Sequence, residues 1–98
     1  MPQWDVASPS KNNPKLDPSA AFGQLLRKHR LRLKMSQEAL AAKSGYERAF
    51  LSLIELGKTN PSLRSIFDIC ASLEMKPSAF LRQVEQLSGF TLPTPRPS

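Results

Sequence analysis

Two short segments of helical periodicity, joined by a glycine, constrain the fold of this chain more than any other feature. Ser36 is a preferred N-cap residue, and the apolar spacing after it predicts a helix over about 37–43. Gly45 suits the left-handed position that follows a helix end. A second helix is predicted over about 47–56. We expect the two helices to pack through their leucine and isoleucine side chains, which leaves the outer face of the second helix exposed.

The rest of the chain predicts three more helices and no strands. Asp17-Pro18-Ser19 combines a capping side chain with a proline in the first turn, and predicts a helix over about 19–34. Two further helices are predicted over about 63–73 and about 77–87. The first of these is expected to turn five side chains inward: Leu63, Ile66, Phe67, Cys70 and Leu73. We therefore expect an all-α domain of five helices over residues 18–88.

Both ends of the 98-residue chain are rich in proline, and we interpret residues 1–17 and 89–98 as flexible, disordered tails. Trp4 either has no role or anchors the first tail to the domain or to a partner. The first tail lacks the apolar stretch of a secretory signal, and no apolar run reaches the ~20 residues of a membrane span. The single cysteine, Cys70, excludes an internal disulfide and a cysteine-based zinc cluster, and fits a reducing, cytosolic setting.

The whole net charge of +6 lies in the centre of the chain. Residues 18–64 hold nine basic side chains against three acidic ones, whereas acids and bases balance in the remainder. A basic patch is typical of a surface that meets a polyanion, although charge alone fits a merely soluble surface equally well. The basic residues of this central segment are Arg27, Lys28, Arg30, Arg32, Lys34, Lys43, Arg48, Lys58 and Arg64.

The two central helices and their flanks carry the segments Ser36-Gln37-Glu38-x-Leu40-Ala41, Gly45, and Ile54-Glu55-x-Gly57-Lys58-x-Asn60-Pro61-Ser62. This motif resembles the lambda-repressor-like (Cro and XRE) helix-turn-helix family. The resemblance extends over roughly residues 19–86. A narrower resemblance, to the controller proteins of restriction–modification systems, rests on Arg48-x-Phe50-Leu51-Ser52 before Ile54-Glu55.

The resemblance implies a sequence-specific transcriptional regulator that places its second motif helix in the major groove of double-stranded DNA. The positions that face bases in this family correspond to Glu47, Arg48, Ala49, Ser52 and Leu53. Arg48 is the strongest candidate for base readout, because a guanidinium can pair in bidentate fashion with a guanine edge; contact to phosphate alone is the alternative. Ala49 and Leu53 offer contact to a thymine methyl group, unless Leu53 is a surface residue without a role. At Glu47 we favour helix capping over a hydrogen bond from a cytosine amino group.

Contacts to phosphate are implied at Gln37, Lys43, Phe50, Lys58 and Asn60. Gln37 matches a family position that contacts a phosphate or holds the first recognition residue. Lys58 and the Asn60 backbone follow the second motif helix, where the family binds the phosphate chain. Phe50 either lies against sugar and phosphate at the rim or belongs to the core.

The family also pairs the Glu55 position with the Arg30 position, which implies a structural ion pair between the first helix and the second motif helix. No catalytic or metal site is expected, because His29 has no second histidine to complete a zinc site and lies on an apolar face. Cys70 is expected in the core. We predict no enzyme activity, no cofactor and no small-molecule ligand.

The family usually binds a palindromic operator as a dimer, and we expect a homodimer here. The helix over 77–87 is the candidate interface, through Phe80, Leu81, Val84 and Leu87, unless these side chains complete the protein's own core. The resemblance implies a bacterial, cytoplasmic, nucleoid-associated protein. The alternative function is an antitoxin-like or other protein-interaction subunit, in which the tails and Trp4 bind another protein and DNA binding is secondary.

Overall fold

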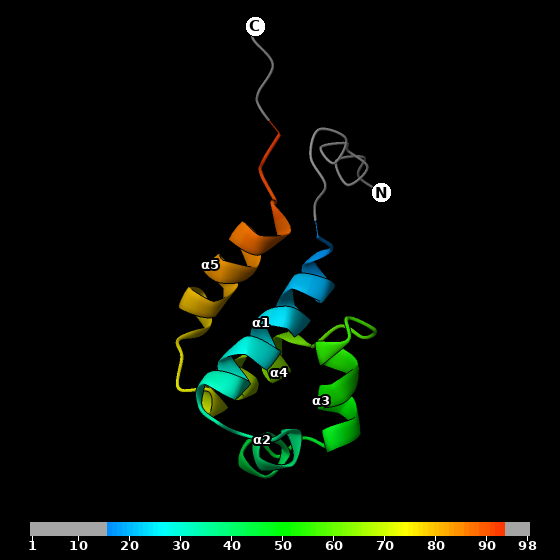
Figure 1. Ribbon diagram of the computed structural model, residues 1–98. Coiled ribbons are helices and arrows are strands. Elements are labelled where there is room, and N and C mark those ends of the chain that lie inside the picture. Colours follow the sequence, from blue (N-terminus) through cyan, green and yellow to red (C-terminus); the bar gives the residue numbers. More distant parts are fainter. Residues whose placement is uncertain (1–15, 94–98) are drawn as a thin grey trace, which may run out of the picture.

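Five helices and no strand make up the part of the chain that the computed structural model describes, residues 16–93 (Figure 1). The predicted all-α fold class is confirmed. The helices are α1 (Pro18–Arg32), α2 (Gln37–Ser44), α3 (Arg48–Glu55), α4 (Leu63–Ser72) and α5 (Pro77–Ser88). The predicted tails fall largely on residues 1–15, which include Trp4, and on residues 94–98. Both ranges lie outside the described residues.

Short polar side chains begin three of the helices, as the capping signals predict. The Asp17 carboxylate accepts a hydrogen bond from the Ser19 amide at 2.9 Å. The Ser36 and Ser62 hydroxyl oxygens each accept one from the amide three residues later, at 3.0 Å. α3 differs, because its N-cap residue Glu47 makes no side-chain capping bond. The favoured capping role of Glu47 is therefore wrong, and its exposed carboxylate faces solvent.

α1 and α4 both end earlier than predicted, and each is followed by the same kind of left-handed turn. Lys34 and Glu74 have φ values of 60° and 61°, in the left-handed region that usually takes glycine. The amides of Met35 and Met75 then donate to carbonyl oxygens five residues earlier, at 3.0 Å. Both methionine side chains pack against the core, which holds the turn without a glycine. The predicted ends, at about 34 and about 73, lie slightly beyond the observed ones at Arg32 and Ser72, because this turn has no glycine signal in the sequence.

The core lies between α1 and the other four helices. Phe80 of α5 is fully buried, with its ring 4.8 Å from that of Phe22 and 5.8 Å from that of His29. Val84 is only 8% exposed. Neither side chain has surface to offer a partner, so both belong to the protein's own core. Their predicted role in a dimer interface is wrong.

α4 presents a different side to the core than its apolar pattern predicts. Leu63 and Phe67 were expected inside, but they are 69% and 52% exposed. Ser65 and Ile69 are buried instead. The apolar stripe of α4 is wider than the core it covers, so one edge of the stripe lies in solvent.

α1 is the central element, with α3 and α5 on opposite sides of it (Figure 1). Gly23 lets α1 approach the end of α3 closely. A Cβ atom at this position would overlap the carbonyl oxygen of Ile54 and lie 2.7 Å from that of Glu55. The helix-turn-helix is thereby held directly against α1.

His29 and Cys70 are both buried between the helices. The His29 ring is buried, and its Nδ1 accepts a hydrogen bond from Arg32 Nε at 3.2 Å. Nε2 therefore carries the proton and donates to Gln83 Oε1 at 2.7 Å. Burial raises the pKa of the Cys70 thiol to about 11, so this thiol stays protonated at neutral pH.

None of the described helices is long and apolar enough to cross a membrane. Within residues 16–93, no three His, Cys, Asp or Glu side chains gather as a metal site would require.

Candidate nucleic-acid interface

One face of α3 is exposed along its whole length. Leu51 and Ile54 are fully buried and attach the helix to the core. The opposite face carries Arg48, Ala49, Ser52 and Leu53, which recur at the spacing of one helix face. Leu53 is 44% exposed, and Ser52 is half-buried. The structure therefore brings four of the five predicted base-contacting residues onto one surface, with Glu47 exposed at its N-terminal end.

A buried ion pair ties this helix to α1. Arg30 Nε donates to Glu55 Oε2 at 2.7 Å, and the Arg30 terminal nitrogen Nη2 donates to Oε1 at 3.0 Å. The two side chains are only 6% and 5% exposed. Arg30 also donates to the Met35 carbonyl oxygen at 2.8 Å. The hydrogen bonds to Glu55 raise the pKa of Arg30 above its ordinary value, so this guanidinium stays charged.

The same Glu55 carboxylate determines how Gln37 is oriented. Gln37 Nε2 donates to Glu55 Oε1 at 3.0 Å. A carboxylate can only accept here, so the Gln37 amide nitrogen must face it. The amide oxygen then points the other way and accepts a hydrogen bond from Arg48 Nη1 at 3.1 Å. A chain of hydrogen bonds thus runs from the core to the exposed guanidinium on α3.

Arg48 has a second partner, Glu38 of α2. The distance from Arg48 Nε to Glu38 Oε2 is 3.5 Å, and the two side chains are 51% and 73% exposed. The Arg48 guanidinium therefore lies between a neutral acceptor and an acidic one, both from the first turn of α2. Glu38 was not among the predicted site residues.

The turn between α2 and α3 packs as an aromatic unit. Gly45 has φ 84° and supplies the predicted left-handed turn. The Tyr46 ring lies 5.5 Å from that of Phe50, and both side chains pack against the core. The Tyr46 hydroxyl donates to Asp68 Oδ2 at 2.7 Å, a bond that raises the Tyr46 pKa and ties the turn to α4. Phe50 is thus half-buried, and the structure places it with the core rather than among the exposed residues of α3.

The remaining predicted phosphate contacts are split between two places. Lys58 and Asn60 are exposed in the loop after α3. The Asn60 side-chain oxygen accepts a hydrogen bond from the Ser19 hydroxyl, and the Lys58 amide donates to the Leu53 carbonyl oxygen at 2.9 Å. Lys43 lies at the other end of α2, where it pairs with Glu74 at 3.2 Å. The structure does not bring Lys43 together with the exposed face of α3.

The central basic residues are almost all at the surface. Of the nine between residues 18 and 64, only Arg30 is buried. Charge of this density on one small domain attracts a polyanion.

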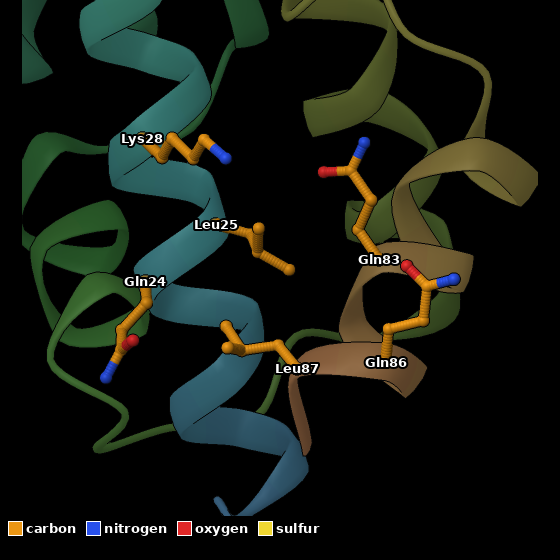
Figure 2. Close-up of a pocket in the computed structure, with 6 residues that line it drawn as sticks. All are labelled: Gln24, Leu25, Lys28, Gln83, Gln86 and Leu87. Carbon is orange, nitrogen blue, oxygen red and sulfur yellow. The ribbon is translucent and has the colours of Figure 1, made fainter. Parts of the chain in front are cut away.

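A shallow groove also lies between α1 and α5 (Figure 2). It is lined by Gln24, Leu25, Lys28, Gln83, Gln86 and Leu87. Leu25 and Lys28 point from α1 toward α5, away from the α3 side of α1. The groove is therefore separate from the exposed face of α3.

Three functional contacts were missed at the sequence level. These are the Glu38–Arg48 pair, the Tyr46–Asp68 bond and the close approach at Gly23. The first had a usable signal, because Glu38 directly follows Gln37, whose position in the family contacts a phosphate or holds the first recognition residue. The other two join elements far apart in the chain and have no local signature.

Comparison with known proteins places the motif in context. The helix-turn-helix family model HTH_3 matches residues 26–80. The restriction-modification controller protein C.AhdI from Aeromonas hydrophila is 35% identical with a TM-score of 0.60, over 67% of this chain and 94% of that protein. No curated protein matches the chain.

Two further solved structures have similar folds. The controller protein C.Esp1396I, solved as a tetramer in complex with its natural 35 base-pair operator, is 26% identical with a TM-score of 0.69; the match covers 78% of this chain and 100% of that one. The clp gene regulator ClgR from Corynebacterium glutamicum is 22% identical with a TM-score of 0.73, over 78% of this chain and 81% of that one. At 22% identity the likeness to ClgR shows the fold alone.

Proposed function

The chain belongs to the helix-turn-helix family of DNA-binding transcription regulators, and we propose that it binds a specific double-stranded operator with α3 in the major groove. The observation that carries the proposal is the exposed face of α3, on which Arg48 is oriented from the core through Gln37. An α-helix fits the width of the major groove, and Arg48 lies at the N-terminal end, which contacts base edges in this motif.

Base readout is assigned to the exposed face of α3. Arg48 pairs with the O6 and N7 atoms of a guanine, and Ser52 donates to a base or a phosphate. Ala49 and Leu53 contact thymine methyl groups. Glu47, which is free of a capping role, accepts a hydrogen bond from a cytosine amino group.

Phosphate contacts are assigned on both sides of α3. The second hydrogen of the Gln37 amide nitrogen is left for a phosphate, because Glu55 accepts only one. Lys58 and the Asn60 backbone bind the phosphate chain beyond the end of α3. Lys43 and Phe50 are not retained in this set, because Lys43 pairs with Glu74 and Phe50 packs against Tyr46.

Replacing Arg48 by alanine tests the proposal. A specific site is first selected from random duplexes with the wild-type protein. The Arg48→Ala variant is expected to bind this site about 5- to 150-fold more weakly, the range of one bidentate contact to guanine, and to bind random duplexes almost as before. Gel shifts with both duplexes measure the effect. Equal discrimination by wild type and variant would exclude Arg48 as the reading residue.

We further propose a homodimer on a palindromic site. One short recognition helix reads only a few base pairs, and C.Esp1396I binds its operator as a tetramer. With Phe80 and Val84 buried, the interface is assigned to exposed apolar side chains of α4 and α5: Leu63, Phe67 and Leu81. Leu87 is left out, because it lines the groove against α1 and lies about 120° around α5 from Leu81.

The Phe67→Gln variant tests this interface. We expect wild-type protein to sediment as a dimer at micromolar concentration and the variant to shift toward monomer, because a large apolar contact is lost. Leu31→Gln is the matched control, since Leu31 is 49% exposed on α1 and is not part of the assigned interface. A wild-type species of monomer mass, or equal dissociation of both variants, contradicts the assignment.

The likeness to C.AhdI supports a controller-like regulator. We propose that it acts at the nucleoid, where its DNA target lies. The alternative, an interaction subunit of the antitoxin kind, depends on the tails and Trp4. Neighbouring genes separate the two, because a controller accompanies a methyltransferase and an endonuclease, whereas an antitoxin accompanies a toxin.

A further inference from the structure

We infer that Glu38 is a specificity-determining residue, whose carboxylate pairs with Arg48 until the correct base edge displaces it. The inference rests on the proposed function, in which α3 enters the major groove. It deepens that function by assigning a role to an acidic side chain next to a DNA-reading arginine. An acid at such a place is otherwise unfavourable, because it faces the phosphates of the DNA.

The geometry places Arg48 between one hydrogen-bond acceptor and one anionic partner, both from α2. Glu38 Oε2 lies 3.5 Å from Nε, and Gln37 Oε1 accepts from Nη1 at 3.1 Å. Gln37 is itself oriented by buried Glu55, so its half of this arrangement is rigid. The Glu38 half is exposed and independent of the core. DNA can therefore replace Glu38 without disturbing the fold.

The net charge of the Arg48–Glu38 pair explains how the pair affects the affinity for different DNA sequences. While Arg48 and Glu38 remain paired, their net charge is zero, so Arg48 adds no counterion release to binding. On a duplex without a suitable base, the pair stays closed and Arg48 contributes little. On the operator, Arg48 leaves Glu38 for a guanine edge.

The magnitudes are compatible with such an exchange. An exposed ion pair contributes at most about five-fold to an equilibrium. A bidentate contact with guanine discriminates by about 5- to 150-fold. A single exposed contact to a phosphate is comparable to the internal pair. The correct base therefore displaces Glu38, whereas a phosphate gains little by doing so.

Neutralising Glu38 tests the inference. Binding of Glu38→Gln to the selected operator and to a scrambled duplex of equal length is measured by fluorescence anisotropy over a series of NaCl concentrations. We expect the affinity for the scrambled duplex to rise about two- to five-fold. Its logarithmic salt dependence should steepen by about 0.9, the value for one additional phosphate contact. The operator affinity should change less, so the ratio of the two affinities falls.

Two controls separate the internal pair from general repulsion. Glu85→Gln removes the same charge from an exposed site on α5, which packs on α1 and α4. The second control repeats Glu38→Gln in an Arg48→Ala background. The inference requires that the steepening of the salt dependence vanish in that background, because no guanidinium is left to contact a phosphate; any remaining gain in affinity comes from removing an unpaired carboxylate. An equal steepening with and without Arg48, or a gain of the single variant no larger than that of Glu85→Gln, overturns it.

The outcome also distinguishes this inference from the proposed function. If Arg48→Ala loses discrimination while Glu38→Gln changes nothing, only the role of Glu38 is wrong. If Arg48→Ala keeps full discrimination, the proposed reading residue is wrong and the role of Glu38 falls with it. Thermal melting of each variant verifies that it is folded.

Discussion

Replacing Arg30 by alanine is expected to lower the free energy of unfolding by about 3–5 kcal/mol, the usual cost of breaking a buried ion pair from one side. The loss leaves the Glu55 carboxylate, which is 5% exposed, without its cationic partner. It also removes the hydrogen bond to the Met35 carbonyl oxygen. Because the total free energy of unfolding of a small domain is only slightly larger than this loss, much of the variant should be unfolded at physiological temperature. Chemical denaturation monitored by circular dichroism measures the change.

The exposed Lys43–Glu74 pair supplies the control. Its side chains are 43% and 66% exposed, so Lys43→Ala should cost no more than about 1 kcal/mol. The double variant Arg30→Met/Glu55→Met should be more stable than Arg30→Ala, because no buried charge remains unpaired. An Arg30→Ala variant with an unchanged melting temperature would show that the pair does not hold α3 to α1.

A Gly23→Ala substitution is expected to destabilise the domain by about 2–3 kcal/mol, although alanine is the better helix former. The added methyl group overlaps the Ile54 carbonyl oxygen and approaches that of Glu55. These are backbone atoms, so they cannot rotate away as a side chain would. α1 and α3 must separate, which weakens the core and shifts the Arg30–Glu55 pair. Urea denaturation measures the loss.

Gly45→Ala provides the comparison for this prediction. Gly45 has φ 84°, and nothing lies within 4 Å of a Cβ atom built there. Its replacement should therefore cost only the strain of the left-handed conformation, about 1 kcal/mol. A Gly23→Ala variant as stable as Gly45→Ala, or more stable, would refute the close approach of α1 to α3.

Helix termini illustrate how far local rules extend. Ser36 and Ser62 cap their helices because a short hydroxyl side chain reaches an amide three residues later whatever packs around it. Gly45 adopts a left-handed conformation for an equally local reason. Lys34 and Glu74 adopt the same conformation without being glycine. Their strain is offset by the packing of the following methionine, which only the neighbouring helices provide.

The core likewise shows which features follow from local sequence patterns and which depend on tertiary packing. Apolar periodicity predicted an inward stripe on α4 and a free stripe on α5. Phe67 is instead half exposed, and Phe80 is completely buried against Phe22. Periodicity defines which side of a helix is apolar. How much of that side is covered depends on where the partner helices lie.

The sequence by itself, with the segment around Gly45 as its strongest signal, therefore determined the local structure. The order of five helices, the turn at Gly45 and the outward residues of α3 follow from capping, backbone conformation and helical spacing, which act within a few residues. The tertiary structure decided which partners those residues meet. Arg48 of α3 lies between Gln37 and Glu38 of α2. The Gln37 amide is oriented by Glu55 at the end of α3, and Glu55 is itself held by Arg30 of α1. Such contacts depend on distances between elements in space, and spacing along the chain does not contain those distances.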